Sequence, residues 1–152
     1  EQGVLAGFPL VDVRVELYDG KSHPVDSKDI AFQIAGREVF KIAFEKAGPE
    51  LMEPVVHMEI TVPGQFMGEV NGYLSSHRGR PLGMDAFGEY QTIEAEIPMA
   101  EVMNFSTDLQ SMTGGEGSYT MSLSHYGVVP THLKSKIISA HKREVEEKKA
   151  KK

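Results

Sequence analysis

The chain has 152 residues, of which 40% are hydrophobic and 25% charged, a globular composition that excludes collagen-like and wholly disordered chains. It contains no cysteine, which removes disulfides, thiolate nucleophiles and cysteine-ligated zinc; this fits a reducing compartment, and we expect a cytoplasmic protein. No apolar run approaches the roughly 18 residues that span a bilayer, so we expect no membrane partner. The net charge is −6, which gives no long-range attraction for phosphates, and any contact with RNA must therefore be local.

The charge is unevenly distributed along the chain. Residues 142–152 hold six Lys or Arg and three Glu, which leaves 10 basic and 19 acidic residues, a net charge of −9, for residues 1–141. The first residue is Glu, and a strand pattern starts almost at once. We therefore expect this sequence to be a piece of a longer chain.

The N-terminal part predicts one strand followed by an exposed loop. Apolar and polar residues alternate over residues 11–18, which is the period of a strand with one buried face. Asp19-Gly20 then favours a tight reversal. The segment from Asp19 to Pro24, which contains His23, is expected to form an exposed loop tip.

A helix is predicted over residues 28–47, after this loop. Asp26 or Ser27 can cap it, and its apolar stripe is wide enough to predict burial on more than one side. Gly48-Pro49 supplies a left-handed end and then a residue that cannot continue a helix. Residues 1–48 are therefore expected to form a βαβ-type partial domain.

The region from residue 53 to 126 predicts an α+β domain of the order βαββαβ. Strand patterns alternate with helical ones, and on the first strand Val56, Met58, Ile60 and Val62 form the apolar face. The predicted strands are 53–62, 80–87, 90–97 and 119–124, and the predicted helices are 66–78 and 99–112. This order is the ferredoxin-like plan, in which two helices cover one face of a four-stranded antiparallel sheet and leave the other face available for a partner. A last helix is predicted over 130–148, with residues 149–152 as a frayed basic tail.

No motif in the chain predicts catalysis or metal binding. There is no G-x-x-x-x-G-K-[ST], and Gly114, Gly115 and Gly117 stand between a helix and a strand, the reverse of a phosphate cradle. Nucleophile elbows and H-E-x-x-H are missing, and no two of the six histidines stand four residues apart on one helix. We expect no catalytic residue, metal ligand or bound cofactor in this chain, and neither GTP nor ATP binding.

Three sites remain as candidates for recognition, each with a structural alternative. His23 lies on a loop between two well-specified elements, where recognition residues are common, although position alone favours an inert exposed histidine. Arg78 and Arg80 flank Gly79 at a helix end, where arginine can contact phosphate or pair with the last helical carbonyls. The sheet face that carries His57, Thr120 and Ser122 can be a binding face or a solvated surface.

Several segments, in order and over almost the whole chain from Gly3 to Ile138, resemble the C-terminal part of the elongation factor G family, the ribosomal translocases. The resembling segments are VLAGFPLV at 4–11, YDGKSHPVDS at 18–27, AFQIAGREVFK at 31–41, EPVVHMEITVP at 53–63, GEVNGYLSSHRG at 68–79, IPMAEVMNFSTDLQSMTGGEGSYTM at 97–121 and HYGVVP at 125–130. Together they are far more specific than any one of them.

The resemblance implies a division into family domains. Residues 1–48 would be the second half of domain IV, which enters the ribosomal A site, and residues 53–128 would be the ferredoxin-like domain V. The helix 130–148 would pack back on domain IV. The GTPase domain, with its GTP and Mg²⁺, would lie upstream, so this piece would not be an enzyme although its parent would be a GTPase.

The resemblance also implies RNA contacts. His23 matches the histidine at the tip of domain IV, so Gly20, Lys21, Ser22 and His23 would contact the decoding centre and the tRNA–mRNA region of the A site. His77, Arg78 and Arg80, at the end of the first helix of domain V, would contact large-subunit rRNA near the GTPase-associated centre. The partners implied are the ribosome and the upstream domains of the parent chain.

Three departures from the family pattern bear on function. Ser22 stands where the family usually has an aromatic residue, His77 replaces the first arginine of Arg-Arg-Gly, and Glu116 lies in a glycine loop that is commonly basic. Each loses contact area or positive charge, which indicates a divergent, second-copy type of factor. A recycling or ribosome-protection factor of the same family, and a ferredoxin-like module that binds a ligand or protein on its free sheet face, stay open as alternatives.

Overall fold

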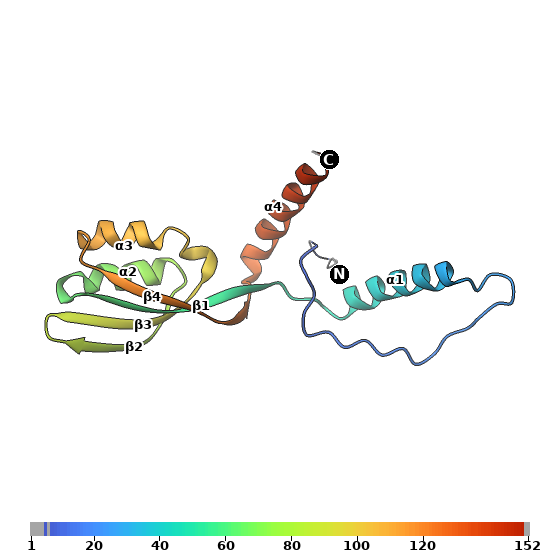
Figure 1. Ribbon diagram of the computed structural model, residues 1–152, viewed down its shortest axis with the longest axis horizontal. Coiled ribbons are helices and arrows are strands. Elements are labelled where there is room, and N and C mark those ends of the chain that lie inside the picture. Colours follow the sequence, from blue (N-terminus) through green and yellow to red (C-terminus); the bar gives the residue numbers. More distant parts are fainter. Residues whose placement is uncertain (1–4, 6, 151–152) are drawn as a thin grey trace. The chain divides into compact units, whose positions relative to one another are not determined.

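The computed structural model describes residue 5 and residues 7–150, and the chain divides into two compact units (Figure 1). One unit comprises Met52–Val129, and the other comprises Glu1–Leu51 together with Pro130–Lys152. Among the described residues, no helix has both the length and the apolar character that crossing a membrane requires.

The unit Met52–Val129 contains a four-stranded sheet and two helices. Its elements are β1 (Met52–Pro63), a 3₁₀ turn η1 (Gly64–Phe66), α2 (Met67–Ser76), β2 (Arg80–Phe87), β3 (Tyr90–Pro98), a 3₁₀ turn η2 (Met99–Glu101), α3 (Phe105–Thr113) and β4 (Ser118–Val128). The strand order is β2-β3-β1-β4 and every neighbouring pair is antiparallel. Helices α2 and α3 lie on the same side of the sheet (Figure 1). The predicted ferredoxin-like α+β fold is confirmed.

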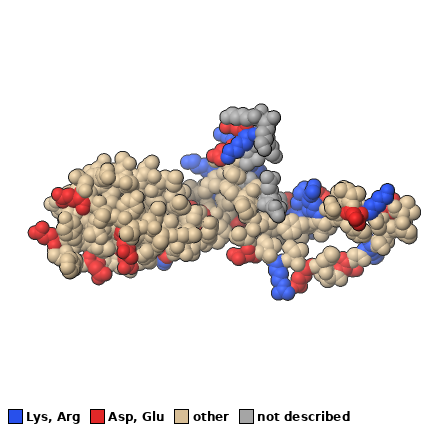
Figure 2. Space-filling model, in the orientation of Figure 1, with Lys and Arg blue, Asp and Glu red and all other residues tan. Residues whose placement is uncertain are grey.

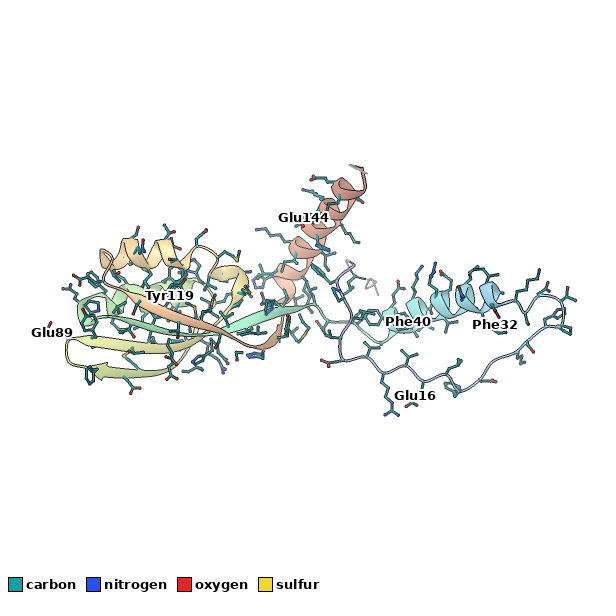
Figure 3. The ribbon with its side chains drawn as sticks, in the orientation of Figure 1. Glu16, Phe32, Phe40, Glu89, Tyr119 and Glu144 are labelled. Atoms are coloured by element: carbon teal, nitrogen blue, oxygen red, sulfur yellow. The ribbon has the colours of Figure 1, made fainter. Side chains whose placement is uncertain are left out.

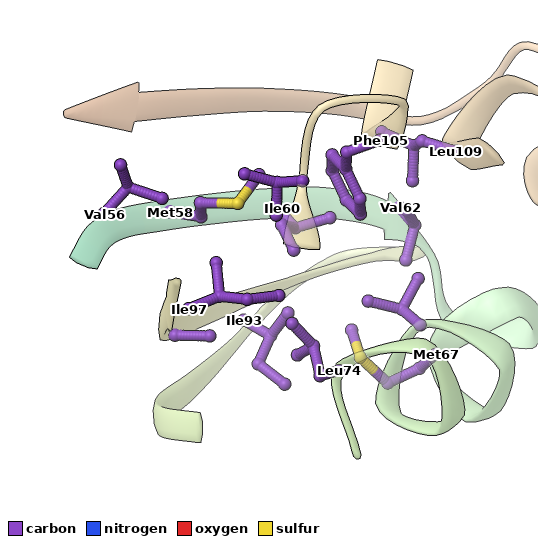
Figure 4. Close-up of a cluster of buried hydrophobic side chains, with 13 residues drawn as sticks. Val56, Met58, Ile60, Val62, Met67, Leu74, Ile93, Ile97, Phe105 and Leu109 are labelled. Carbon is purple, nitrogen blue, oxygen red and sulfur yellow. The ribbon is translucent and has the colours of Figure 1, made fainter. Parts of the chain in front are cut away.

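The core lies between the sheet and the two helices (Figure 4). The four residues predicted as the apolar face of β1 are all buried, as are the matching positions of β3 and the inner faces of α2 and α3. The residues concerned are Val56, Met58, Ile60, Val62, Ile93, Ala95, Ile97, Met67, Val70, Leu74, Phe105 and Leu109. Because side chains alternate along a strand, burying this set places the polar set of β1 on the opposite face.

The opposite face of the sheet is polar, and neither α2 nor α3 covers it (Figure 1). His57 in β1 stands opposite Glu96 in β3 and Ser122 in β4, and Glu59 stands opposite Glu94 and Thr120. Thr61 and Thr92 share a hydrogen bond of 2.8 Å between their hydroxyl oxygens. Polar side chains of three strands therefore meet on this face.

The other unit contains two helices, α1 (Asp29–Lys46) and α4 (Thr131–Ala150). Here the strand predicted at residues 11–18 is wrong, because no strand is formed among the described residues before α1. Val11, Val13 and Val15 are 63%, 47% and 67% exposed. Alternation marks a face suited to burial, but a strand also needs a partner for its backbone groups, and the described chain offers these residues none.

Helix α1 corrects two further expectations. Its N-cap is Lys28, without a side-chain hydrogen bond, so neither Asp26 nor Ser27 caps it. The apolar stripe is not covered within the described chain: α1 has no buried residue, and Ile30 and Ile34 are more than half exposed. The predicted end is confirmed, since Gly48 has a left-handed φ of 69° immediately before Pro49.

Helix α4 starts one residue after Pro130 and continues through Ala150, two residues past the predicted end; residues 151–152 of the predicted tail lie outside the described residues. Two contacts tie it to the N-terminal part of the same unit. Lys134 Nζ donates to a carboxylate oxygen of Glu50, and the ring of Phe8 stacks on that of His141 with centroids 3.9 Å apart.

Candidate nucleic-acid interface

The loop before α1 folds back on itself around His23. The peptide N–H of His23 donates to Ser27 Oγ, and the N–H of Ser27 donates in return to the carbonyl oxygen of His23 at 3.2 Å. Ser27, predicted as a helix cap, instead closes this loop. The reversal lies at Pro24–Asp26, and not at Asp19-Gly20 as predicted.

The imidazole of His23 is largely exposed, with 67% of its side chain accessible. Its Nδ1 accepts a hydrogen bond from the N–H of Val25 at 3.3 Å and lies 3.4 Å from Asp26 Oδ2. In the neutral tautomer that accepts this hydrogen bond from Val25, the ring proton lies on Nε2. That N–H is a donor of the kind that phosphate and carbonyl oxygens of RNA accept.

The other predicted tip residues, Gly20, Lys21 and Ser22, are all exposed. The N–H of Gly20 donates to Asp19 Oδ1 at 2.7 Å. The structure thus keeps the four candidate residues on one exposed segment, with a single cation, Lys21, beside the histidine.

The end of α2 brings the second group of candidates together through a left-handed turn at Arg78, whose φ is 58°. The N–H of Gly79 donates to the carbonyl oxygen of Leu74 at 2.7 Å, and that of His77 donates to the carbonyl oxygen of Tyr73 at 3.0 Å. This six-residue closure is a Schellman end, in which the left-handed position is usually glycine. Here it is an arginine, and the glycine comes one residue later.

The guanidinium of Arg78 is held by two carboxylates. Its Nη1 and Nη2 donate to the two oxygens of Glu53 at 2.6 and 3.0 Å, and its Nε donates to Glu101 Oε1 at 2.8 Å. The side chains of Arg78 and Glu53 are only 26% and 11% exposed. The hydrogen bonding to Glu53 is the largest cause that raises the pKa of Arg78 above its ordinary value. Sequence analysis missed this cluster, and no local pattern marks Glu53 or Glu101 as its members.

A stacked pair lies beside this cluster. The rings of Tyr73 and His77 are 3.9 Å apart and nearly parallel, and His77 Nδ1 lies 2.9 Å from the carbonyl oxygen of Tyr73. The hydroxyl of Tyr73 lies 3.3 Å from Asp108 Oδ2 and 3.2 Å from the carbonyl oxygen of Glu101. Burial, followed by the charge of Asp108, raises the pKa of Tyr73 to about 12. His77 is therefore half-buried and fixed in orientation.

Arg80 points to a different partner. Its Nη2 donates to Glu96 Oε2 at 2.5 Å, and 71% of its side chain is exposed. Glu96 also accepts from Ser124 Oγ at 2.9 Å, and the hydrogen bond from Arg80 is the first cause that lowers the pKa of Glu96. The three residues 77, 78 and 80 thus lie close in the chain, but only Arg80 leaves most of its cationic group accessible.

Most of the visible surface of the sheet unit is uncharged, and the charged side chains that appear on it are mainly acidic (Figure 2). Figure 3 labels Glu89, at the β2–β3 turn, and Tyr119, in β4. Among the described residues there is no group of three histidine, aspartate or glutamate side chains that could hold a metal ion. Gly114 is the left-handed end of α3, so the glycine loop follows the negative end of a helix and does not fit a nucleotide phosphate.

The fold and site therefore define a ferredoxin-like domain joined to a unit that exposes a histidine-bearing loop. The family described as elongation factor G C-terminus matches residues 50–137, and the one described as elongation factor G, domain IV, matches residues 1–48. The chain belongs to the elongation factor G family.

Individual relatives support this family assignment. An elongation factor G-like protein of Thermotoga maritima is 47% identical over 148 residues, 97% of this chain and 22% of that protein. The elongation factor G of Aquifex pyrophilus is 47% identical over 138 residues, 91% of this chain and 20% of that protein. A crystal structure of a Thermus thermophilus protein superimposes with a TM-score of 0.79 and 41% identity, covering 93% of this chain and 22% of that one. The chain therefore spans about a fifth of the length of these relatives.

Proposed function

We propose that this chain is the ribosome-contacting C-terminal part of a translational GTPase that promotes tRNA and mRNA translocation. In this proposal the loop with Gly20, Lys21, Ser22 and His23 enters the decoding region of the A site. The observation that carries it is the exposed His23, closed into its loop by Ser27, within the residues that match domain IV. Such a factor works in the cytoplasm, beside the ribosome.

The chemistry of the loop supports an RNA contact. The Nε2–H of His23 and the ammonium of Lys21 are both donors without an acceptor lone pair, which suits phosphate oxygens. A single cation gives weak binding, but a factor held to the ribosome by several domains needs only local contacts at each of them. The net charge of −6 is compatible with this role, because the loop orients and the rest of the factor supplies affinity.

GTP and Mg²⁺ belong, in this proposal, to an upstream domain of the full-length factor. The residues of this chain do not fit a nucleotide, since the glycine loop follows the C-terminal end of α3. The chain itself is therefore proposed to act as a recognition element and not as an enzyme.

A second contact is proposed at the end of α2, with large-subunit rRNA near the GTPase-associated centre. Of the sequence-based candidates His77, Arg78 and Arg80, the first is half-buried on Tyr73 and the last is mostly exposed. Because most of the Arg80 side chain is exposed, its guanidinium can bind a phosphate and keep part of its contact with Glu96.

The test of the tip is the His23→Ala variant of the full-length factor in a single-round translocation assay. We expect slower translocation at saturating factor, because the loop loses a donor at the decoding centre. Ser27→Ala, which removes the hydroxyl that closes the loop, should give a smaller slowing. His132→Ala, at an exposed position of α4, is the matched control and should leave the rate unchanged. An unchanged rate in His23→Ala would contradict the proposed role.

Recycling or ribosome protection within the same family is a second candidate. The observation that favours it is Ser22, which provides no aromatic surface next to His23. A ribosome-splitting assay run beside the translocation assay distinguishes the two: activity in splitting alone would replace translocation as the function.

A further inference from the structure

The three donors that Arg78 uses all bind carboxylates of its own domain. Two of them bind both oxygens of Glu53, the second residue of β1, and the third binds Glu101 in η2. Arg78 itself lies between α2 and β2. We call Arg78, Glu53 and Glu101 the clasp, because one guanidinium joins three separate elements.

The backbone conformation at residue 78 does not call for an arginine, so the contacts of the Arg78 side chain must explain why it stands there. A left-handed φ of 58° is unfavourable for a long side chain such as arginine, and a glycine at this position would form the same helix end without strain. Strained residues persist where surrounding contacts fix them. The hydrogen bonds to Glu53 and Glu101 are the contacts that do so.

The charge of the clasp argues against an RNA contact by Arg78. One positive and two negative groups give the clasp a net charge of −1 if both carboxylates are ionised, and only 26% of the arginine side chain is exposed. A phosphate that approached would compete with a bidentate carboxylate and be repelled by both acids.

The position of Glu53 gives the clasp a role in the whole factor. The chain enters this unit at Met52 and leaves it at Val129, and Met52 is paired with Val128. Both covalent connections of the unit therefore leave from neighbouring positions at one end of the sheet. Glu53 directly follows Met52, where the chain enters the unit, and the clasp holds it against the end of α2.

We propose that Arg78 is a positioning residue, which through Glu53 and Glu101 fixes the end of the sheet where the chain enters and leaves the domain, and that it does not contact RNA. This goes beyond the proposed function, on which only the ribosomal part of the following test rests.

The first part of the test is thermal unfolding of the 152-residue chain. Arg78→Met and Glu53→Met should each lower the midpoint by more than about 5 °C, because Arg78→Met leaves both carboxylates without the guanidinium and Glu53→Met leaves the guanidinium with Glu101 alone, in a poorly exposed site. The double variant should lose less than the sum of the two. Arg78→Lys keeps the charge but not the bidentate geometry, so its unfolding midpoint should lie between those of the unmodified chain and Arg78→Met. It can still be measured if Arg78→Met does not fold. Arg80→Met, with an exposed ion pair, is the stability control and should shift the midpoint by less than about 2 °C.

The second part measures ribosome binding of the full-length factor against salt concentration, and single-round translocation. A lost phosphate contact would lower the slope of log affinity against log salt by about 1. For the clasp we expect an unchanged slope in both Arg78→Met and Glu53→Met, with translocation slowed by a similar factor in each. Lys21→Met, at the tip, should lower the slope.

The outcomes separate the two proposals. Additive midpoint losses, or a lower salt slope in Arg78→Met with normal binding in Glu53→Met, would overturn the clasp. If the unmodified factor neither binds the ribosome nor translocates, the proposed function fails, and the unfolding data alone decide whether the clasp stands.

Discussion

Gly79 lies so close to Leu74 that any side chain in its place would force the end of α2 to shift. A Cβ built on Gly79 would lie 2.8 Å from the carbonyl oxygen of Leu74 and 3.0 Å from its Cα. Contacts under 3.0 Å to backbone force a shift, and the backbone of Leu74 belongs to α2, whose side chain at that position is buried in the core. The glycine of the His-Arg-Gly sequence is thus required for space.

Gly79→Ala should destabilise the domain by roughly 1–3 kcal/mol, because the end of α2 must open and weaken the 2.7 Å hydrogen bond from Gly79 to Leu74. Denaturant unfolding of the 152-residue chain measures the change. Gly83→Ala is the matched control, since nothing lies within 4 Å of a Cβ built there; it should change stability by less than about 1 kcal/mol. Equal stabilities of the two variants would show that the helix end yields to the added methyl group.

The hydroxyl of Thr113 supports the glycine loop that follows α3. It donates to the carbonyl oxygen of Leu109 at 2.8 Å and accepts from the N–H of Gly117 at 2.9 Å, in a side chain that is 1% exposed. Thr113→Val keeps the shape but leaves the N–H of Gly117 without this acceptor, and should cost about 1–3 kcal/mol. Thr113→Ser keeps the hydroxyl and should cost about 1 kcal/mol, the value of one buried methyl group. Chemical unfolding of both variants gives the comparison, and a costlier serine variant would contradict the role of the hydroxyl.

The sheet unit could be predicted from sequence because its elements are completed within the chain. The period-two pattern predicts β1, and in the structure β1 pairs with β3 and β4. Its buried face contains Met58 and Ile60, as the pattern predicts. The segment around Val13 has an equally clear pattern, yet forms no strand here. A period reports which face is suited to burial, whereas strand formation depends on a partner that the pattern does not contain.

The candidate site also has a part that the sequence predicts and a part that only the folded structure reveals. His23 could be singled out because a loop between two strong patterns is visible in the sequence. The role of Ser27 in closing that loop could not be predicted. The clasp could not be predicted, because Glu53 and Glu101 lie 25 and 23 residues from Arg78 and meet it only once the sheet and helices have packed. Pairing between distant charges is a property of the fold.

The exposed apolar face of α1 gives a prediction about stability. Ile34 is 55% exposed and Ile60 is fully buried. In the 152-residue chain Ile60→Ala should cost about 2–5 kcal/mol, and Ile34→Ala less than about 1 kcal/mol, since alanine also favours the helix.

The same Ile34→Ala substitution should cost more in the full-length factor, where we propose that further chain covers this face. Unfolding of the two proteins with and without the substitution tests this. An equal and small effect in both would show that Ile34 is solvent-exposed in the complete factor as well.

The burial of Tyr73 and its contact with Asp108 predict a loss of stability at high pH. The pKa of Tyr73 is raised from 10.0 to about 12 in the folded chain, so between these values the unfolded chain releases the tyrosine proton while the folded chain retains it. Since stability falls with pH wherever the folded state binds more protons, the contribution of Tyr73 is complete below pH 10 and is lost as the pH rises towards 12. Tyr73→Phe has no such proton, so the stability advantage of the unmodified chain over this variant should shrink across that range. Asp108→Asn removes the second cause of the raised pKa, so the loss should be smaller and should end at a lower pH. Unfolding midpoints of the three proteins at a series of alkaline pH values give the test, and a constant difference between the unmodified chain and Tyr73→Phe would show that the hydroxyl does not titrate as its contacts require.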